Sequence, residues 1–262
     1  MSIVTGPAQM QKERGDGDAL LLSACAVAFL TSAAVTVYSC SGASCCTSVQ
    51  MPGGWTMSKI WLPSPDHGWA GSFAMFLLMW IVMMLAMMLP SLTPVLLRFN
   101  RNGASPADVG RVAGAYFLVW TIFGAIAYPI GAALGSIAMH QERLSRGVPF
   151  LTGAALLLAG LVQWTPWKAR HLECCRGAPS CEVTHSRGAW QAGWKLGVHC
   201  AECCLAIMTF MLVAGAMELR VMLLTTAILT PERVLPRSML VARMVGAAMV
   251  LGGTYMLLHP RG

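Results

Sequence analysis

Residues 69–89 read WAGSFAMFLLMWIVMMLAMML and contain no charged side chain. A helix of about 20 apolar residues is long enough to cross the ~30 Å hydrocarbon layer of a membrane. Five further stretches are comparably apolar, and we expect helices over residues 20–38, 112–139, 148–164, 197–229 and 239–258. Composition agrees, because 56% of the residues are hydrophobic and only 11% are charged. The sequence therefore predicts an all-α fold, a polytopic transmembrane bundle of six helices.

Three of these stretches raise local questions. The stretch 197–229 is interrupted by Glu218 and Arg220, so it forms either one long tilted helix or a span followed by a short half-helix, which would make a seventh. The stretch 20–38 is longer than the ~7 to 15 residues of a signal-peptide core, and we interpret it as a retained helix. Proline residues predict that the second span ends at Pro90 and that Pro129 kinks the third.

Lysine and arginine residues in the loops predict the orientation, because cytoplasmic loops hold the excess of both. With the N-terminus in the cytoplasm, the loops on that side hold Lys12, Arg14, Arg98, Arg101, Arg111, Lys168, Arg170, Arg176, Arg187 and Lys195. The loops on the other side hold Lys59, Arg143 and Arg146. We therefore expect a multi-pass protein of a bacterial inner membrane, in contact with membrane lipid, with a cytoplasmic N-terminus. The charges form no basic stripe with stacking aromatics, which argues against nucleic acid as a partner.

The sequence HCAECC at residues 199–204 carries the most specific chemistry. Residues three and four apart on a helix share a face, so Cys200, Cys203 and Cys204 can present their sulfur atoms to one point, with His199 one turn before Cys203. Thiolates bind soft metals such as Cu(I), and zinc is the alternative metal. Further candidate ligands in the preceding loop are Cys174, Cys175, Cys181, His171 and His185. Inert buried thiols and redox pairs are the competing interpretations.

Methionine residues provide a second candidate set on the span 69–89. Met75 begins a series at intervals of four, with two further methionines beside its last members. Thioether sulfur is a soft, uncharged ligand that can bind Cu(I) without placing a carboxylate in the membrane. The predicted ligands on this helix are Met79, Met83, Met84, Met87 and Met88. Ordinary packing is the competing interpretation, because methionine fills gaps in many apolar cores.

The remaining polar features leave alternatives open. Cys40, Cys45 and Cys46 follow the first predicted helix, on the side expected to be oxidising, where a disulfide and metal capture are equal alternatives. Glu218 is either a structural partner of Arg220 or a site carboxylate. We expect no enzyme, because the chain lacks a Walker loop, an HExxH motif, a dinucleotide glycine pattern and a nucleophile elbow.

Several blocks of the chain together resemble the bacterial family of predicted metal-binding integral membrane proteins. These blocks are MWIVMMLAMMLPS at 79–91, GVHCAECC at 197–204, GAMEL at 215–219, TPWK at 165–168 with the pair Cys174 and Cys175, and PER at 231–233. The resemblance covers about residues 69–255 and implies a membrane protein that binds a metal. The chain differs from the family pattern at Glu202, Leu205 and Glu218, where glycine, tryptophan and asparagine are expected. The methionine spacing is also locally similar to the Met-x-x-x-Met pattern of eukaryotic high-affinity copper transporters.

These observations favour copper handling, in which Cu(I) is captured, transferred or transported between the methionines and the cysteine cluster. One alternative is an accessory or assembly subunit of a larger membrane metalloenzyme, with other membrane subunits or a copper-dependent membrane enzyme as partners. Another is a thiol–disulfide protein that passes electrons between the two cysteine groups. The expected organisation is a cytoplasmic segment at 1–18, a first helix with its outer loop at 19–68 and a metal-binding membrane domain at 69–262.

Overall fold

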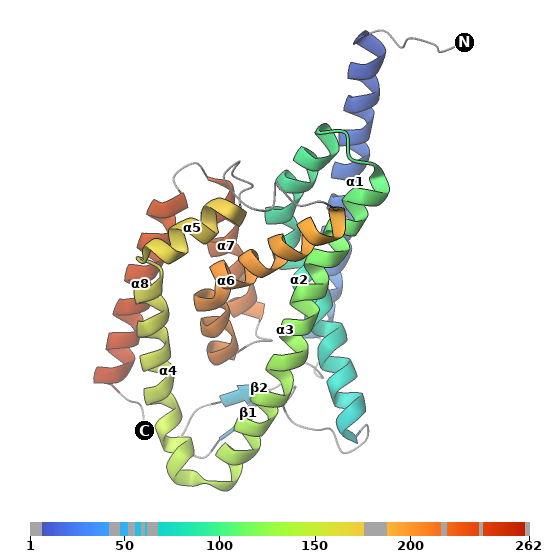
Figure 1. Ribbon diagram of the computed structural model, residues 1–262. Coiled ribbons are helices and arrows are strands. Elements are labelled where there is room, and N and C mark those ends of the chain that lie inside the picture. The colour runs from blue at the N-terminus through green and yellow to red at the C-terminus, as the bar shows by residue number, and fades with distance from the viewer. Residues whose placement is uncertain are drawn as a thin grey trace.

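The computed structural model describes residues 7–41, 48–51, 56–58, 61, 68–175, 188–215, 219–235 and 238–259. Within these ranges the chain forms eight α-helices and one pair of short antiparallel strands (Figure 1). The helices are α1 Pro7–Ser41, α2 Gly68–Arg101, α3 Pro106–His140, α4 Glu142–Val162, α5 Pro166–Cys175, α6 Ala189–Gly215, α7 Leu219–Val234 and α8 Ser238–Leu258, and the strands are β1 Ser48–Gln50 and β2 Thr56–Ser58. Six of the helices are long and apolar enough to cross a membrane, namely α1, α2, α3, α4, α6 and α8. The predicted helical class with six such helices is confirmed.

The prediction that the second span ends at Pro90 is wrong. Helix α2 continues through Pro90 and Pro94 to Arg101. A proline removes one backbone hydrogen bond, but membrane helices tolerate this when nearby hydroxyl groups and neighbouring helices compensate. In the same turn, the Ser91 hydroxyl donates to the Met88 carbonyl at 2.9 Å, and the Thr93 hydroxyl donates to the Leu89 carbonyl at 2.8 Å. Pro129 likewise lies inside α3.

The interrupted fifth stretch forms two helices, as the half-helix alternative proposed. Helix α6 ends at Gly215, and the 16-residue α7 begins at Leu219, so α6 crosses the bundle and α7 is a shorter segment. Glu218 lies outside the described residues, and its proposed pairing with Arg220 stays a prediction. Two elements were not expected from the sequence, namely the ten-residue helix α5 and the pair formed by β1 and β2.

Glycine residues allow two pairs of helices to pack closely. On α4 and α8, a Cβ atom at Gly160 would come within 2.7 Å of the Gly246 carbonyl oxygen, and one at Gly253 would come equally close to the Gly153 carbonyl oxygen. Small residues at such contacts are typical of membrane helix packing. On α6, a Cβ atom at Gly197 would come within 2.9 Å of Val119 on α3. This close approach places the cysteines of α6 beside α3.

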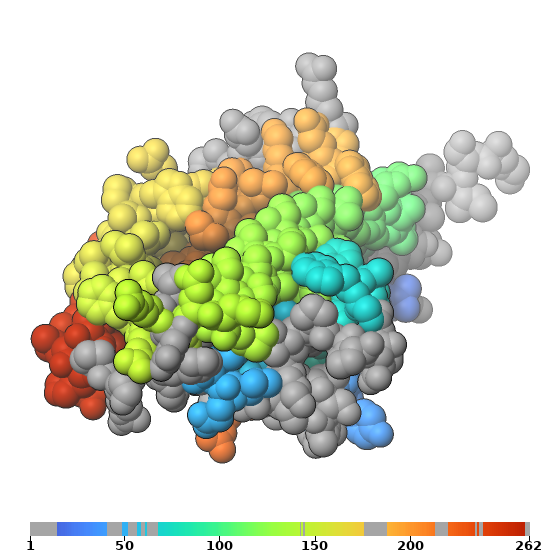
Figure 2. Space-filling model, turned by 90° about the horizontal axis from the view of Figure 1, so that it is seen from below, coloured from blue at the N-terminus to red at the C-terminus, as the bar shows by residue number. Residues whose placement is uncertain are grey.

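Helix α6 lies at the centre of the bundle, where it packs against α3, α4, α5 and α7. Figure 1 shows α5 at the same end as the beginning of α1, with β1 and β2 at the opposite end. The end-on view in Figure 2 shows α3 running across the molecule between α8 and α2. Large apolar side chains remain exposed around the outside, among them Leu30 on α1, Leu158 on α4 and Leu251 on α8. An outer surface of this kind fits a lipid environment, and the polar chemistry is concentrated around α6.

Candidate metal centre

Four buried thiols from two helices form the centre of the molecule. Helix α6 contributes Cys200, Cys203 and Cys204, as their helical spacing predicts, and α5 contributes Cys175. The thiols hydrogen-bond as a ring, in which Cys175 contacts Cys200 and Cys203, and Cys204 contacts the same two residues. These hydrogen bonds to Cys200 and Cys203, followed by burial, raise the pKa of the Cys175 thiol well above its usual value. A thiol with a raised pKa holds its proton more firmly, which allows Cys175 to donate to its neighbours.

A buried arginine from α7 supplies positive charge to this ring. One terminal nitrogen of Arg233 lies 3.0 Å from the sulfur of Cys200 and 2.5 Å from that of Cys204. Its other terminal nitrogen donates to the Ser91 hydroxyl at 3.0 Å. The Tyr116 hydroxyl lies 2.8 Å from the Cys200 sulfur on the α3 side. A guanidinium in this position compensates negative charge on the sulfur atoms, which makes the pocket suited to thiolates.

A second buried ion pair holds α5 against α6 and α7. Lys168 on α5 pairs with Glu232 on α7, and each side chain is only 1% exposed. The ammonium group also donates to the Cys203 backbone carbonyl at 2.6 Å. Burial raises the pKa of Glu232, with Lys168 opposing the shift. Burial lowers the pKa of Lys168, but negative charge on Cys203 and Glu232 outweighs this and raises it above its usual value.

A small cavity lies beside the thiols. Its wall includes Tyr116, Cys175, Cys200 and Arg233, together with apolar side chains from α2 and α6. The cavity has room for about one water molecule. Pockets for organic ligands are usually ~300 to 1,000 Å³, far larger than this space. The cavity therefore suits a single ion.

The methionines of α2 fill the core next to this centre. Met79, Met83, Met84, Met87 and Met88 are all buried, whereas Met75 is half exposed and lies off their shared face. A nitrogen of Arg233 lies 3.8 Å from the Met88 sulfur, so one guanidinium contacts both this thioether and the thiols. Met208 and Met211 on α6 belong to the same buried cluster. The buried stripe thus ends next to the cysteine ring.

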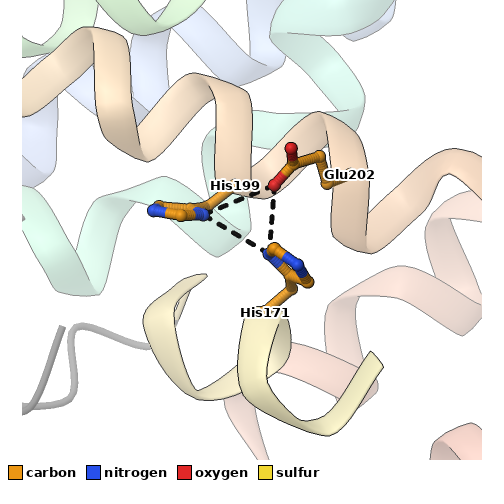
Figure 3. Close-up of side chains that lie close together, drawn as sticks. All are labelled: His171, His199 and Glu202. Atoms are coloured by element: carbon orange, nitrogen blue, oxygen red, sulfur yellow. Dashed lines mark hydrogen bonds and ion pairs between the residues drawn. The ribbon is translucent and has the colours of Figure 1, made fainter. Parts of the chain in front are cut away.

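A third group of ligands lies on the more exposed side of α6. His171 from α5 meets His199 and Glu202 from α6, and the three side chains point toward one another (Figure 3). One ligand atom from each lies within 4.8 Å of the other two. Among the residues that the structure describes, the four thiols form no comparable group of three mutually close atoms. His199, predicted to join the thiols, instead faces His171 and Glu202.

Some of the predicted ligands lie elsewhere or outside the described residues. Cys174 is disulfide-bonded, so its sulfur is not a free thiolate ligand in this structure. Cys40 is partly buried at the end of α1, and Cys25 is a partly buried packing residue of the same helix. The predicted residues that lie outside the described ranges are Cys45, Cys46, Cys181 and His185.

Four residues of the centre were not singled out as site residues from the sequence. Glu232 and Arg233 entered only as parts of the family resemblance. Lys168 entered there and in the count of loop charges, and Tyr116 was not considered. A signal was present for the first three, because a charged residue near a membrane helix has to find a partner. Tyr116 lies within an apolar run of α3 and carries no comparable signal.

Comparisons with known proteins agree with a metal-related role. A family model described as PpoB2, copper chaperone, matches residues 77–256, which is more than half of the chain. The matched range includes both side-chain clusters and leaves out α1 and the two strands. No curated protein and no solved structure matches the chain.

Proposed function

Because the chain belongs to the PpoB2 copper chaperone family, we propose that it binds Cu(I) at the ring of Cys175, Cys200, Cys203 and Cys204 and passes the ion to a recipient protein. The observation that carries this proposal is the convergence of four buried thiols, two of which, Cys175 and Cys200, line a cavity with room for one ion. Thiolates and thioethers are the ligands that select Cu(I), and both kinds lie here. Copper is thus the cargo of the protein and needs no catalytic step.

The guanidinium of Arg233 supports a cation as the natural occupant. Burying an isolated charge is costly, so an anionic sulfur pocket inside the bundle requires a compensating positive charge. Arg233 supplies that charge through its contacts with Cys200 and Cys204. Cu(I) also carries a single positive charge. Binding can therefore replace one cation with another next to the thiolates without changing their local charge balance.

The methionine stripe gives copper a path of soft ligands. Met88 lies next to Arg233, and the other buried methionines continue along α2 away from the thiols. Thioether groups bind Cu(I) weakly compared with thiolates and carry no charge, which suits passage through an apolar bundle. We propose that the affinity for Cu(I) increases from the methionines of α2 to the cysteines of α6 and α5.

The setting of the protein is part of the proposal. We place the six apolar helices in a bacterial inner membrane, with the N-terminus and α5 facing the cytoplasm, because the lysine and arginine excess lies on that side. A recipient would be a copper-dependent membrane enzyme or another membrane subunit, bound through exposed apolar helix surfaces. Zinc is the competing metal for the thiol ring.

A thiol–disulfide function is the second candidate. It is favoured by one observation, namely that disulfide-bonded Cys174 directly precedes the free thiol Cys175. Disulfides are typical of oxidising compartments, whereas the proposed orientation has this helix on the cytoplasmic side. A redox function predicts that the Cys174 disulfide exchanges reversibly with the thiols of α6, and a copper function does not require this exchange.

Copper binding by purified protein tests the main proposal. The detergent-solubilised full chain should take up Cu(I) in competition with a chromophoric chelator. The combined change of Cys200, Cys203 and Cys204 to serine should abolish this binding. Cys25→Ser is the matched control, because Cys25 lies in α1 and is absent from the ring. It should bind as the unchanged protein does.

The outcome separates the candidate functions. Unchanged Cu(I) binding in the triple serine variant would show that the thiol ring is not the copper site. Preferential binding of Zn²⁺ over Cu(I) by the ring would replace copper with zinc as cargo. Stable copurification with a large metalloenzyme, without metal in this chain, would favour the assembly-subunit alternative.

A further inference from the structure

His171, His199 and Glu202 form a group that is separate from the thiol ring in chemistry and in exposure. The distance from Nδ1 of His171 to Oε2 of Glu202 is 3.1 Å, and the corresponding distance from His199 is 3.5 Å. The three side chains are 18%, 25% and 41% exposed, whereas the cysteines of the ring are buried. The group is therefore more exposed than the thiol ring, although Oε2 of Glu202 itself is buried.

With both histidines neutral, hydrogen bonding within the group does not satisfy all of its polar atoms. The Nδ1 atoms of His171 and His199 are 3.3 Å apart, and between two neutral imidazoles only one of these atoms can carry the shared proton. Oε2 of Glu202 is buried within the group and has no hydrogen-bond partner, although it lies close to both rings. A buried acceptor left in this way is costly. Lone pairs from two imidazoles and a carboxylate thus face a common point, which is the arrangement that a metal cation satisfies.

The donor set identifies the class of cation. Two imidazole nitrogens and one carboxylate oxygen form a His₂Glu set, which binds borderline divalent ions such as Zn²⁺ and Cu²⁺. Cu(I), in contrast, prefers the sulfur ligands of the ring. Trp167 packs against the His171 ring with centroids 4.5 Å apart, which restricts the orientation of this ligand. A partly restricted ligand loses less freedom when the ion binds.

We infer that His171, His199 and Glu202 constitute a second metal site, at the exposed end of the α5–α6 contact, that binds a borderline divalent cation. The two sites are joined through the backbone, because His199 precedes Cys200, Glu202 precedes Cys203, and His171 lies one helical turn before Cys175. An ion at the outer site fixes α5 against α6 and thereby the position of Cys175 relative to the other thiols. Only this coupling between the two sites rests on the proposed function.

Zn²⁺ titration tests the outer site while the thiols are occupied. Full-length protein saturated with Cu(I) under reducing, oxygen-free conditions is titrated with Zn²⁺ in a calorimeter. One further Zn²⁺ should bind per chain, and His171→Ala, His199→Ala and Glu202→Gln should each weaken that binding by at least about 10-fold, within the range seen when metal-site residues are lost. The matched controls are His140→Ala on α3 and Glu173→Gln on α5, both exposed and outside the group.

Cu²⁺ provides the second probe, in a variant whose four ring cysteines are serines. Electron paramagnetic resonance should show nitrogen coupling from two imidazoles, and His171→Ala should remove part of that coupling. If the serine variant does not fold, the Zn²⁺ titration of the unchanged chain decides alone. Absence of saturable binding for both ions, or binding that the three substitutions leave unchanged, would overturn the inference.

The two proposals can fail separately in these experiments. Zn²⁺ binding that depends on His171, His199 and Glu202 supports the outer site even if Cu(I) does not bind the cysteines. Cu(I) binding that depends on the cysteines, without any such Zn²⁺ or Cu²⁺ binding, would leave the proposed function intact and refute the outer site.

Discussion

The buried pair of Lys168 and Glu232 makes a quantitative prediction about how the site is held together. Both side chains are 1% exposed, so neither charge can be solvated by water when its partner is removed. Removing one member of a buried ion pair typically costs about 3–5 kcal/mol, because the other charge remains buried alone. Lys168→Met and Glu232→Met should therefore each lower the free energy of unfolding by about that amount.

The double variant should cost much less than the sum of the two single changes. With both charges replaced by apolar side chains, the main remaining loss is the hydrogen bond from Lys168 to the Cys203 carbonyl, worth about 1–3 kcal/mol when its acceptor stays buried and unsatisfied. We therefore expect a coupling energy of at least about 3 kcal/mol between the two positions, at the upper end of the range for residues in direct contact.

The assay is reversible unfolding in mixed detergent micelles, followed by helical circular dichroism. Arg170→Met and Glu173→Met are matched controls, because both residues are exposed charges on the same helix α5, and each change should stay within about 0.5 kcal/mol. Additive losses in the double variant, or single losses no larger than those of the controls, would refute the claim that this pair holds α5 in place.

Three further predictions follow from the packing, the soft ligands and the orientation. Gly246→Leu should lower the free energy of unfolding by about 1–3 kcal/mol in the same assay, because it overpacks the α4–α8 contact. Ala248→Leu, at an exposed position of α8, should have no such effect. Equal effects would contradict the close glycine contact. Met88→Leu should weaken Cu(I) binding by about 10-fold, or ~1.4 kcal/mol, in chelator competition. Met75 is half exposed, and Met75→Leu should leave Cu(I) binding unchanged. No difference between the two variants would remove Met88 from the copper site. The orientation is tested in intact cells, in a chain whose Cys40, Cys45 and Cys46 are changed to serine. A membrane-impermeant thiol reagent should label Gln141→Cys but not Ala107→Cys, since these exposed positions lie at opposite ends of α3. The reverse result would invert the predicted orientation.

The sequence predicts the membrane helices well because their signal is local. A run such as residues 69–89 needs no tertiary information to be recognised, since its length and lack of charge already match a membrane. The end of α2 was predicted wrongly because the sequence shows only that Pro90 removes a backbone hydrogen bond. Whether the helix continues past the proline depends on compensating neighbours that are distant in sequence. Arg233 on α7 is such a neighbour, because it donates a hydrogen bond to the hydroxyl of Ser91, which follows Pro90.

The sequence predicted a grouping of side chains only on the helix that carries the motif, and it offered Cys175 as a further ligand without a position in the ring. Helical spacing correctly grouped Cys200, Cys203 and Cys204, because residues on one helix face are fixed by the backbone. The contribution of α5 required knowing that this segment is a helix and that it crosses α6. For the same reason, sequence spacing assigned His199 to the cysteines, whereas the position of His171 on α5 decides that it belongs to the other group.

The geometry of the thiols bears on the proposed choice between cargo binding and a structural zinc site. A closed Cys₄ zinc site with Zn–S bonds of ~2.3 Å needs all four sulfur atoms about 3.8 Å apart. Among the described residues, three mutually close ligand atoms occur at His171, His199 and Glu202, and not among the thiols, which are linked only as neighbouring pairs around a ring. An ion held by one such pair has the next sulfur beside it and can be transferred by exchange of one ligand at a time. The open ring therefore fits the proposed transfer of copper better than it fits a closed structural zinc site.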